Sequence, residues 1–393
     1  MKRVYWRPRK ASKPLLFAIG LVALVGAIVA EHPPQATRGG AEDLQLAAAR
    51  LADRSFLAIR DERIRRGHKF LRRFDPGQTG LVGEAMSLTT SLPADLESKQ
   101  TSVNPNFAAA IVDMLQRAGV RKGDRVAIGC TGSFPAFNVC LAAAVETMNL
   151  RPTMIHSVSS SQYGANHPDF LWLDMENVLY ESGLISFRSD AATLGGFGDR
   201  AVGTSAEVRS LLAASIERNR VRPLAVTRLA QSIDARMEFY RAASEGQSIA
   251  AYVNVGGGAA SIRGSKGKAV LKPGLNQGAK TDFTGIDCVA ARFAAEGVPV
   301  IHLADAVGLA REYGLPIAPL SLPAVDAGGL HSAEPNRLLA GLVLLVILVT
   351  LHVCIWSDFW ERCKAFACRI WPPRRIEFKG TRVLQPFGAE LSV

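Results

Sequence analysis

Two uncharged apolar runs, one near each end of the chain, most constrain how this sequence can fold. The first, "PLLFAIGLVALVGAIVA", covers residues 14–30, and the second, "LLAGLVLLVILVTLHVCIW", covers residues 338–356. At a rise of ~1.5 Å per residue, a helix of either length approaches the ~30 Å thickness of a bilayer core. We therefore expect two transmembrane helices that separate a short N-terminal segment and a C-terminal tail from a large central region.

Basic residues lie on the outer side of each apolar run. Residues 1–13 carry six Lys and Arg and no acid, and residues 337–393 carry eight basic and four acidic residues. The positive-inside rule then places both termini, 1–13 and 357–393, in the cytoplasm, with the central region across the inner (cytoplasmic) membrane. Two alternatives remain open. The first run can be a cleaved signal peptide, although Ile28 and Ala30 are poor cleavage positions, and the second can be a buried helix of a soluble protein.

The charge of the chain does not indicate nucleic-acid binding. The formal net charge is +11, but the middle of the chain contributes 32 basic and 31 acidic residues, so the excess belongs to the two ends. A nucleic-acid surface needs clustered positive charge on the folded domain. The sequence instead predicts membrane lipid, and no nucleic acid, as a partner of the basic ends.

The central region divides into a helical entry segment and a longer α/β segment. Residues 31–76 begin with the linker "EHPPQATRGG" and continue with apolar residues at helical spacing, which predicts an amphipathic helix. In residues 77–330, short apolar runs such as "DRVAIGC" and "VPVIHLADA" alternate with helical patterns. This alternation is typical of a largely parallel sheet with helices on both faces, so we expect an extracytoplasmic α/β domain.

Three stretches of small polar residues follow predicted strands, where a parallel sheet collects its ligands. They are "GCTGSFPA", "SVSSSQYGANHPDF" and "NVGGGAASIRG". Together with the helix that follows the second stretch, they supply the candidate ligand-binding residues, which are Thr131, Gly132, Ser133, Ser159, Ser160, Asn166, Asp174, Gly256, Gly257 and Gly258.

Ser133 lies in the turn between a predicted strand and a predicted helix, and its role has three interpretations. It can be the N-cap of the helix, part of an anion-binding turn, or a nucleophile with His167 or His156 as its base. The turn is not the GxSxG motif of hydrolases, and it lacks the lysine of a phosphate-binding loop. The glycine triplet at 256–258 is not preceded by an acidic residue, which argues against an ATPase.

Other polar residues are weaker candidates. His302 is a third possible base, and a long hydroxyl-rich stretch offers Thr89, Thr90, Lys99 and Asn104. Cysteines 130, 140 and 288 are expected to be buried thiols, with a Cys130–Cys140 disulfide as the alternative. No Cys or His spacing typical of a metal site is present, so neither a metal nor another cofactor is expected.

Several motifs in this order together resemble one bacterial family. They are "SLTTSLPADLESKQTSVNPNFAA", "GDRVAIGCTGSFPAFN", "YGANHPDFLWLDMENVL", "NVGGGAASI" and "IHLADAVGLAREYGLPIAP". In these motifs the chain resembles the poly-gamma-glutamate system protein family. Proteins of this family accompany the synthase that makes the capsule polymer poly-gamma-glutamate. The resemblance implies a pathway and no catalytic residues.

The resemblance predicts an accessory protein of poly-gamma-glutamate capsule biosynthesis or export. Its partners would be the ligase and membrane subunits of the synthase and the polymer chain itself. The alternative is a gamma-glutamyl hydrolase or transferase centred on Ser133. Whether the protein is an enzyme stays open at this level.

Overall fold

The computed structural model describes the chain except for residues 1–16, 18, 27–39, 279–281, 326–336 and 357–393. Its contacts divide the chain into two compact units, one made of residues 36–332 and the other of residues 1–35 with 333–393. The two expected cytoplasmic segments, 1–13 and 357–393, lie outside the described residues.

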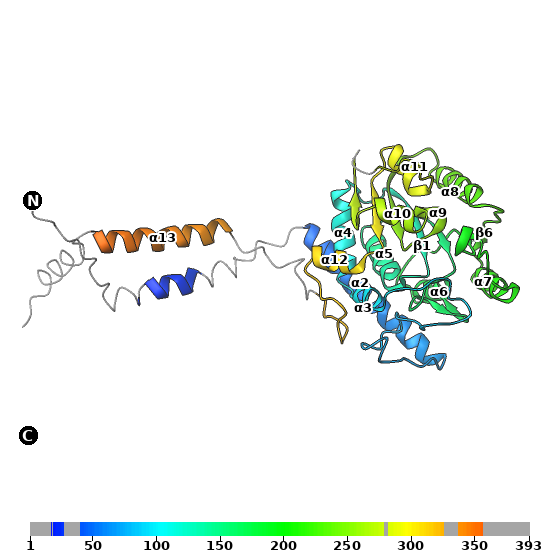
Figure 1. Cartoon of the computed structure of the whole chain (residues 1–393), viewed down its shortest axis with the longest axis horizontal. Helices are drawn as coiled ribbons and strands as arrows, with labels where there is room; N and C mark the ends of the chain where they lie inside the picture. The colour runs from blue at the N-terminus through cyan, green and yellow to red at the C-terminus, as the bar shows by residue number, and fades with distance from the viewer. Residues whose placement is uncertain (1–16, 18, 27–39, 279–281, 326–336, 357–393) are drawn as a thin grey trace, which may run out of the picture. The chain divides into compact units, whose positions relative to one another are not determined.

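A seven-stranded sheet forms the centre of the 36–332 unit (Figure 1). Its order is β6-β5-β2-β1-β7-β9-β8, and every neighbouring pair is parallel except β8 with β9. The strands are β1 (Arg125–Thr131), β2 (Arg151–Ser157), β5 (Ala191–Thr193), β6 (Arg222–Pro223), β7 (Ile249–Val255), β8 (Gly274–Asn276) and β9 (Val300–Leu303). The predicted α/β class with a largely parallel sheet is therefore confirmed.

The central strands are buried over most of their length because helices cover both faces of the sheet. Along β1, Val126 and Ile128 belong to one core cluster, whereas Ala127 between them belongs to a second cluster. Successive side chains of a strand point to opposite faces, so the two clusters are the two sides of the sheet. The first cluster includes residues of α2 (Gly40–Arg65), α4 (Phe107–Arg117), α5 (Pro135–Thr147) and α6 (Trp172–Glu181), and the second includes residues of α8 (Leu229–Ala243), α9 (Ala259–Ile262) and α11 (Val289–Ala295).

Helix α2 packs on the first face through one stripe of its surface. Ala48, Ala52, Phe56 and Ile59 recur at three- or four-residue spacing and are at most 1% exposed. This spacing places them on the side of α2 that contacts α4 and α5. The 26-residue helix is thus held by burial of its apolar stripe.

The remaining elements are short and lie around the sheet. A two-stranded hairpin joins β3 (Asn166–His167) to β4 (Phe170–Leu171). The other helices of this unit are α3 (Leu96–Ser102), η1 (Phe197–Asp199), α7 (Ala206–Arg218), α10 (Ser265–Val270) and α12 (Ala306–Glu312).

The order of the strands reverses direction at β1. From β1 the chain builds β2, β5 and β6 on one side, and it then returns to place β7 and β9 on the other side. The loops that follow β1 and β7 therefore leave the sheet next to each other but in opposite directions. In open parallel sheets, this topological switch point is where a ligand-binding crevice forms.

The second unit contains α13 (Arg337–Trp356), and residues 19–26 are also helical. A Cβ atom placed on Gly26 would lie 2.5 Å from Cγ1 of Val343, so the absence of a side chain at Gly26 lets these two segments pack closely. Within the described ranges, no helix has both the length and the apolar character that crossing a membrane requires.

A fully buried ion pair connects α8 to the sheet. Arg236 and Asp199 are both 0% exposed at their side chains, and Nη2 of Arg236 lies 2.9 Å from Oδ2 of Asp199. The hydroxyls of Ser157 and Thr193, at the ends of β2 and β5, each donate to Oδ1 of Asp199. Ser232 donates to the other carboxylate oxygen. Every charge in this network has partners, which is the condition under which a buried pair is tolerated.

Replacing Asp199 by Asn should lower the free energy of unfolding by about 3–5 kcal/mol, because it leaves the buried Arg236 charge without a counter-ion. The measurement is urea unfolding followed by the fluorescence of Trp172, which is buried and is the one tryptophan in residues 36–332. Asp234→Asn, which removes an exposed ion pair with Arg292, is the control and should cost no more than about 1 kcal/mol. Equal losses in the two variants would contradict this account of the pair.

Candidate functional site

The turns that follow β1 and β7 touch each other at the switch point. The Thr131 hydroxyl, at the end of β1, donates to the carbonyl of Val255, at the end of β7, over 3.3 Å. Gly256 has a φ of +84°, and a Cβ atom there would lie 2.2 Å from Oγ1 of Thr131. A Cβ on Gly258 would lie 3.3 Å from Cγ2 of Thr131, close to van der Waals contact. The first glycine is thus required by both backbone conformation and space.

The serine-rich segment after β2 packs on the same turn. The Gly132 carbonyl accepts hydrogen bonds from Ser160 Oγ (2.9 Å) and from the N–H of Ala165 (2.7 Å). The N–H of Ser161 donates to Oγ of Ser133 over 3.2 Å. Of the sequence-predicted residues, the structure therefore brings Thr131, Gly132, Ser133, Ser160 and the glycine triplet together.

Ser133 is not the N-cap of the helix that follows it. Helix α5 begins at Pro135, its N-cap is Phe134, and no side chain caps it. The proline ring fixes the first helical residue and has no N–H, and the Ser133 hydroxyl instead receives the N–H of Ser161. Of the three interpretations, the anion-binding turn and the nucleophile remain.

Lys99 reaches the serine turn from α3. Its Nζ donates to Oγ of Ser161 over 2.9 Å and to the carbonyl oxygen of Ser133, and it lies 3.8 Å from the ring centroid of Phe134. Burial, together with the positive charge of Lys268, lowers the pKa of Lys99 to about 7. The acceptors and the aromatic face favour the ammonium form, whereas burial favours the neutral amine. Near pH 7 this side chain is therefore able to carry or to release a proton.

Lys268 approaches the switch point from the exposed side. Cε of Lys268 lies 3.2 Å from the position that a Cβ atom on Gly257 would occupy. Lys268 is an exposed residue of α10. Its positive charge contributes, after burial, to the lowered pKa of Lys99 and of His302. The glycine triplet therefore leaves room for Lys268 over the end of β7.

The three candidate histidine bases do not serve Ser133 in this structure. His156 is 0% exposed beneath Trp172, and burial followed by the charge of Arg236 lowers its pKa to about 3. His302 is held by Nδ2 of Asn254 at 2.9 Å, and burial followed by the charge of Lys268 lowers its pKa to about 4. His167 contacts Asp169 and Glu84. The Lys99 amine contacts the Ser161 hydroxyl instead, although in the sequence Lys99 was a polar candidate and not a candidate base.

Asp174, Asn166 and Ser159 have structural partners away from the switch point. The Asp174 carboxylate accepts the N–H of Leu171 at the start of α6 and two hydrogen bonds from the guanidinium of Arg218. The Asn166 amide binds both backbone groups of Glu84, and the Ser159 N–H donates to Leu194. These residues anchor loops and helix ends. The local sequence around such a residue does not distinguish this structural role from ligand binding.

The cysteines of the domain are thiols, as expected. Cys130, Cys140 and Cys288 are free and buried, so the Cys130–Cys140 disulfide alternative is wrong. Burial raises the pKa of each thiol. None of them is a nucleophile at neutral pH.

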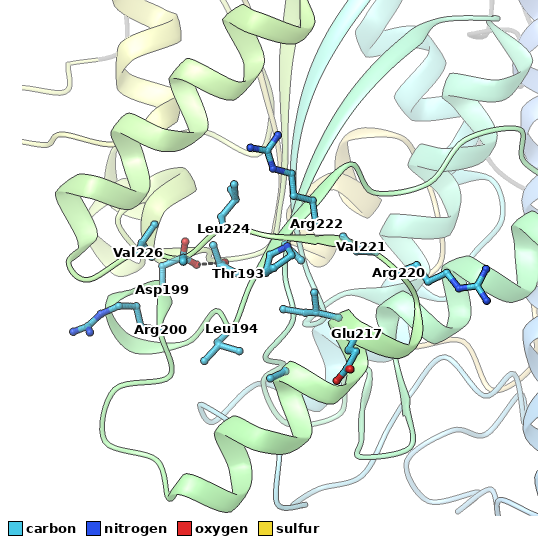
Figure 2. A pocket seen from close by; sticks show the side chains of 15 residues that line it. Thr193, Leu194, Asp199, Arg200, Glu217, Arg220, Val221, Arg222, Leu224 and Val226 are labelled. Carbon is cyan, nitrogen blue, oxygen red and sulfur yellow. Dashed lines mark hydrogen bonds between the residues drawn. The ribbon is translucent and has the colours of Figure 1, made fainter.

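A pocket of about 720 Å³ lies elsewhere, at the β5–β6 edge of the sheet (Figure 2). Its apolar wall includes Leu194, Val221, Leu224 and Val226, and the guanidinium groups of its arginines point away from its middle. The pocket was not predicted from the sequence, and none of the predicted site residues lines it. In the sequence, the glycine-rich stretch "LGGFGD" after β5 was the pattern that could have indicated this pocket.

Comparison with known proteins provides no relative for this chain. No protein-family model matches it, and neither a curated protein nor a solved structure shows significant similarity to it. The switch-point geometry and the motifs that form it are therefore the basis for assigning a function.

The depressed pKa of Lys99 predicts a pH dependence of stability. Between about pH 7 and its ordinary pKa of 10.5, the unfolded chain binds a proton at this residue that the folded chain does not. The free energy of unfolding should therefore rise with pH across this window in the wild type relative to Lys99→Met. Urea unfolding at several pH values measures it, and parallel pH curves for the two proteins would show that Lys99 keeps its charge when folded.

The contact between the turn after β7 and the turn after β1 predicts different effects on stability for substitutions at Gly256 and Gly257. Gly256→Ala should lower the free energy of unfolding by about 1–3 kcal/mol, because it combines a positive φ with a clash against Thr131. Gly257→Ala meets only the end of the flexible Lys268 side chain and should leave the thermal melt nearly unchanged. A Gly257→Ala variant that melts as early as Gly256→Ala would contradict the described turn.

Proposed function

We propose that this protein is a membrane-attached accessory component of poly-gamma-glutamate production or export, and that its α/β unit binds polymer carboxylates at the switch point between β1 and β7. The observation that carries the proposal is the pair of amines, Lys99 and Lys268, at turns built from Thr131, Ser133 and the glycine triplet.

A carboxylate suits this place for reasons of charge and of backbone geometry. Lys268 is exposed and free to approach an anion, and α5 directs its N-terminal, partially positive end toward the serine turn. The middle of the chain is close to neutral, with 32 basic and 31 acidic residues. Attraction of an acidic polymer must then come from a local site rather than from overall charge.

The motifs that carry the family resemblance meet at this site, although they are separate in the sequence. "SLPADLESKQ" supplies Lys99, "GCTGSFPAFN" supplies Ser133, and "NVGGGAASI" supplies Gly256 to Gly258. "YGANHPDF" supplies Ala165, whose N–H donates to Gly132. A shared location is what a common binding function of these motifs would require.

Attachment to the inner membrane is part of the proposal, and the sequence supports it. The uncharged runs at 14–30 and 338–356 have basic residues on their outer sides. The close approach of Gly26 to Val343 fits two helices that pack side by side. In this arrangement, membrane lipid and the ligase and membrane subunits of the synthase are the partners, and the α/β unit lies outside the cytoplasm.

A second candidate function is hydrolysis or transfer at gamma-glutamyl bonds, and the contact between the Lys99 amine and the Ser161 hydroxyl, beside Ser133, favours it. A neutral Lys99 amine can accept the hydroxyl proton of Ser161, which it contacts at 2.9 Å. Ser133 lies next to it, with Oγ 3.2 Å from the N–H of Ser161. Ser161 Oγ, having given its proton to Lys99, would attack the amide carbonyl and form an ester, and the Lys99 ammonium would return that proton to the leaving amine. Water or an acceptor amine would then cleave the ester, with Lys99 as the base in place of His167 or His156.

Binding of poly-gamma-glutamate to the purified full chain in detergent tests the proposed function. Lys268→Gln should weaken binding about three- to tenfold, because it removes one charge–carboxylate contact. Lys266→Gln is the matched control, since Lys266 is exposed on the same short helix, and it should bind like the wild type. Poly-alpha-glutamate, with similar charge but a different backbone, separates specific binding from general attraction.

Failure of the wild type to bind, or equal losses in the two lysine variants, would contradict the site. The same samples test the second candidate function through the length of the polymer after incubation. Shortening that is abolished by Ser161→Ala or Lys99→Met, with the fold intact, would establish catalysis. Binding without shortening supports the accessory role.

A further inference from the structure

Two histidines and an aspartate meet where the end of α2 contacts the β3–β4 hairpin. His68 follows the last turn of α2, His167 ends β3, and Asp169 lies in the hairpin turn. Nε2 of His68 is 3.3 Å from Oδ1 of Asp169, and Nδ1 of His167 contacts the same oxygen. One nitrogen of each histidine and one carboxylate oxygen all lie within 4.8 Å of one another.

The histidine nitrogens lack the hydrogen bonds that their burial calls for. The side chain of His68 is 7% exposed. Within the described part of the chain its Nδ1 has no hydrogen-bond partner, and its Nε2 has only the ion-pair contact with Asp169, without good hydrogen-bond geometry. Nδ1 of His167 is likewise buried without a hydrogen bond of acceptable geometry. Buried polar atoms are nearly always satisfied, so two imidazoles directed at one carboxylate need an explanation. A bound ion would satisfy all three atoms at once.

The spacing of the His68–Asp169 pair fits a small metal ion, and the third ligand atom lies within 4.8 Å of both. Ligand bonds of about 2.0–2.2 Å in a tetrahedral site place the ligand atoms about 3.3–3.5 Å apart. The 3.3 Å between His68 and Asp169 is in this range. The two imidazole rings are stacked with their centroids 4.0 Å apart, which brings their nitrogens to the same side of the carboxylate.

Glu84 lies on the outer side of His167, where metal-bound histidines usually have a carboxylate or carbonyl partner. Its Oε1 lies 3.6 Å from Nε2 of His167, the nitrogen that does not face Asp169. A carboxylate on one ring nitrogen keeps the proton there and leaves the lone pair of the other nitrogen for an ion. The side chains of Glu84 and Asp169 are 42% and 65% exposed, so an ion can enter from solvent.

Charges of both signs surround the cluster. Glu84 and Asp169 supply negative charge, whereas Arg66 and Arg218 donate hydrogen bonds to the carbonyls of Asp169 and Pro168. The three ligand atoms, rather than the local net charge, therefore carry the case for a bound ion.

We propose that His68, His167 and Asp169 bind one divalent transition-metal ion of the zinc type, with Glu84 orienting His167. Nitrogen and carboxylate ligands in this combination suit such ions better than magnesium or calcium. The sequence predicted no metal because His68 and His167 lie in distant segments, and the fold brings them together. This inference does not depend on the proposed polymer binding.

An ion here would connect three parts of the fold. It would fix the end of α2 to the hairpin, whose neighbouring Ala165 donates its N–H to Gly132 in the serine turn. It would also hold Asn166, which binds the backbone of Glu84. Metal binding should therefore stabilise the 36–332 unit as well as the local loop.

The test uses the untagged full chain in detergent, stripped with a chelator and titrated with Zn²⁺ or Co²⁺ alone. Equilibrium dialysis with elemental analysis should give one ion per chain, and Co²⁺ should show the visible absorption of a low-coordinate nitrogen and oxygen site. His68→Gln, His167→Gln and Asp169→Asn should each weaken binding at least about tenfold. Asp61→Asn, an exposed carboxylate on α2, is the matched control and should bind normally.

The Asp169→Asn variant keeps the test decisive if a histidine variant fails to fold, because the side chain of Asp169 is 65% exposed. A thermal melt that rises with Zn²⁺ in the wild type and in Asp61→Asn, but not in Asp169→Asn, supports the site. Absence of binding by the wild type, or equal binding by Asp169→Asn and Asp61→Asn, would overturn it.

Discussion

The position of β1 in the middle of the sheet is the constraint on which the rest of the structure depends. It pairs in parallel with β2 on one side and β7 on the other, and helices cover both faces. Small residues are needed along it, since a Cβ on Gly129 would lie 2.3 Å from the hydroxyl of Tyr252. The loops that follow β1 and β7 leave the sheet in opposite directions, and the candidate site lies where the first turns of these loops touch.

The charge state of Lys99 links stability at this site to its chemistry. The side chain is buried among an aromatic ring, a carbonyl and a hydroxyl, which stabilise an ammonium, while burial disfavours it. As a cation, Lys99 holds the serine turn in place and adds positive potential for an anionic ligand. As a neutral amine, it is a base for Ser161. The binding hypothesis thus uses the protonated form of Lys99, and the catalytic hypothesis uses its neutral form.

The sequence allowed the parallel α/β sheet to be predicted, because apolar runs such as "DRVAIGC" and intervening helices are local patterns. It also located the turns at 131–133 and 256–258, since parallel strands end at one edge. It did not show the antiparallel β8, the buried pair of Asp199 with Arg236, or the meeting of His68 with His167. These depend on contacts between distant segments. Asp174 resembled a ligand in the sequence because a carboxylate that anchors a helix has the same local pattern as one that binds.

The central claim is that an acidic polymer contacts the switch point, and zero-length cross-linking measures this directly. Carbodiimide activation of poly-gamma-glutamate carboxylates, followed by peptide mass spectrometry of the full chain, identifies the lysines that touch the polymer. The account predicts that Lys268 is modified in preference to other exposed lysines such as Lys122 and Lys266. Cross-links spread evenly over exposed lysines, or concentrated at Lys122 beyond the opposite end of β1, would contradict it.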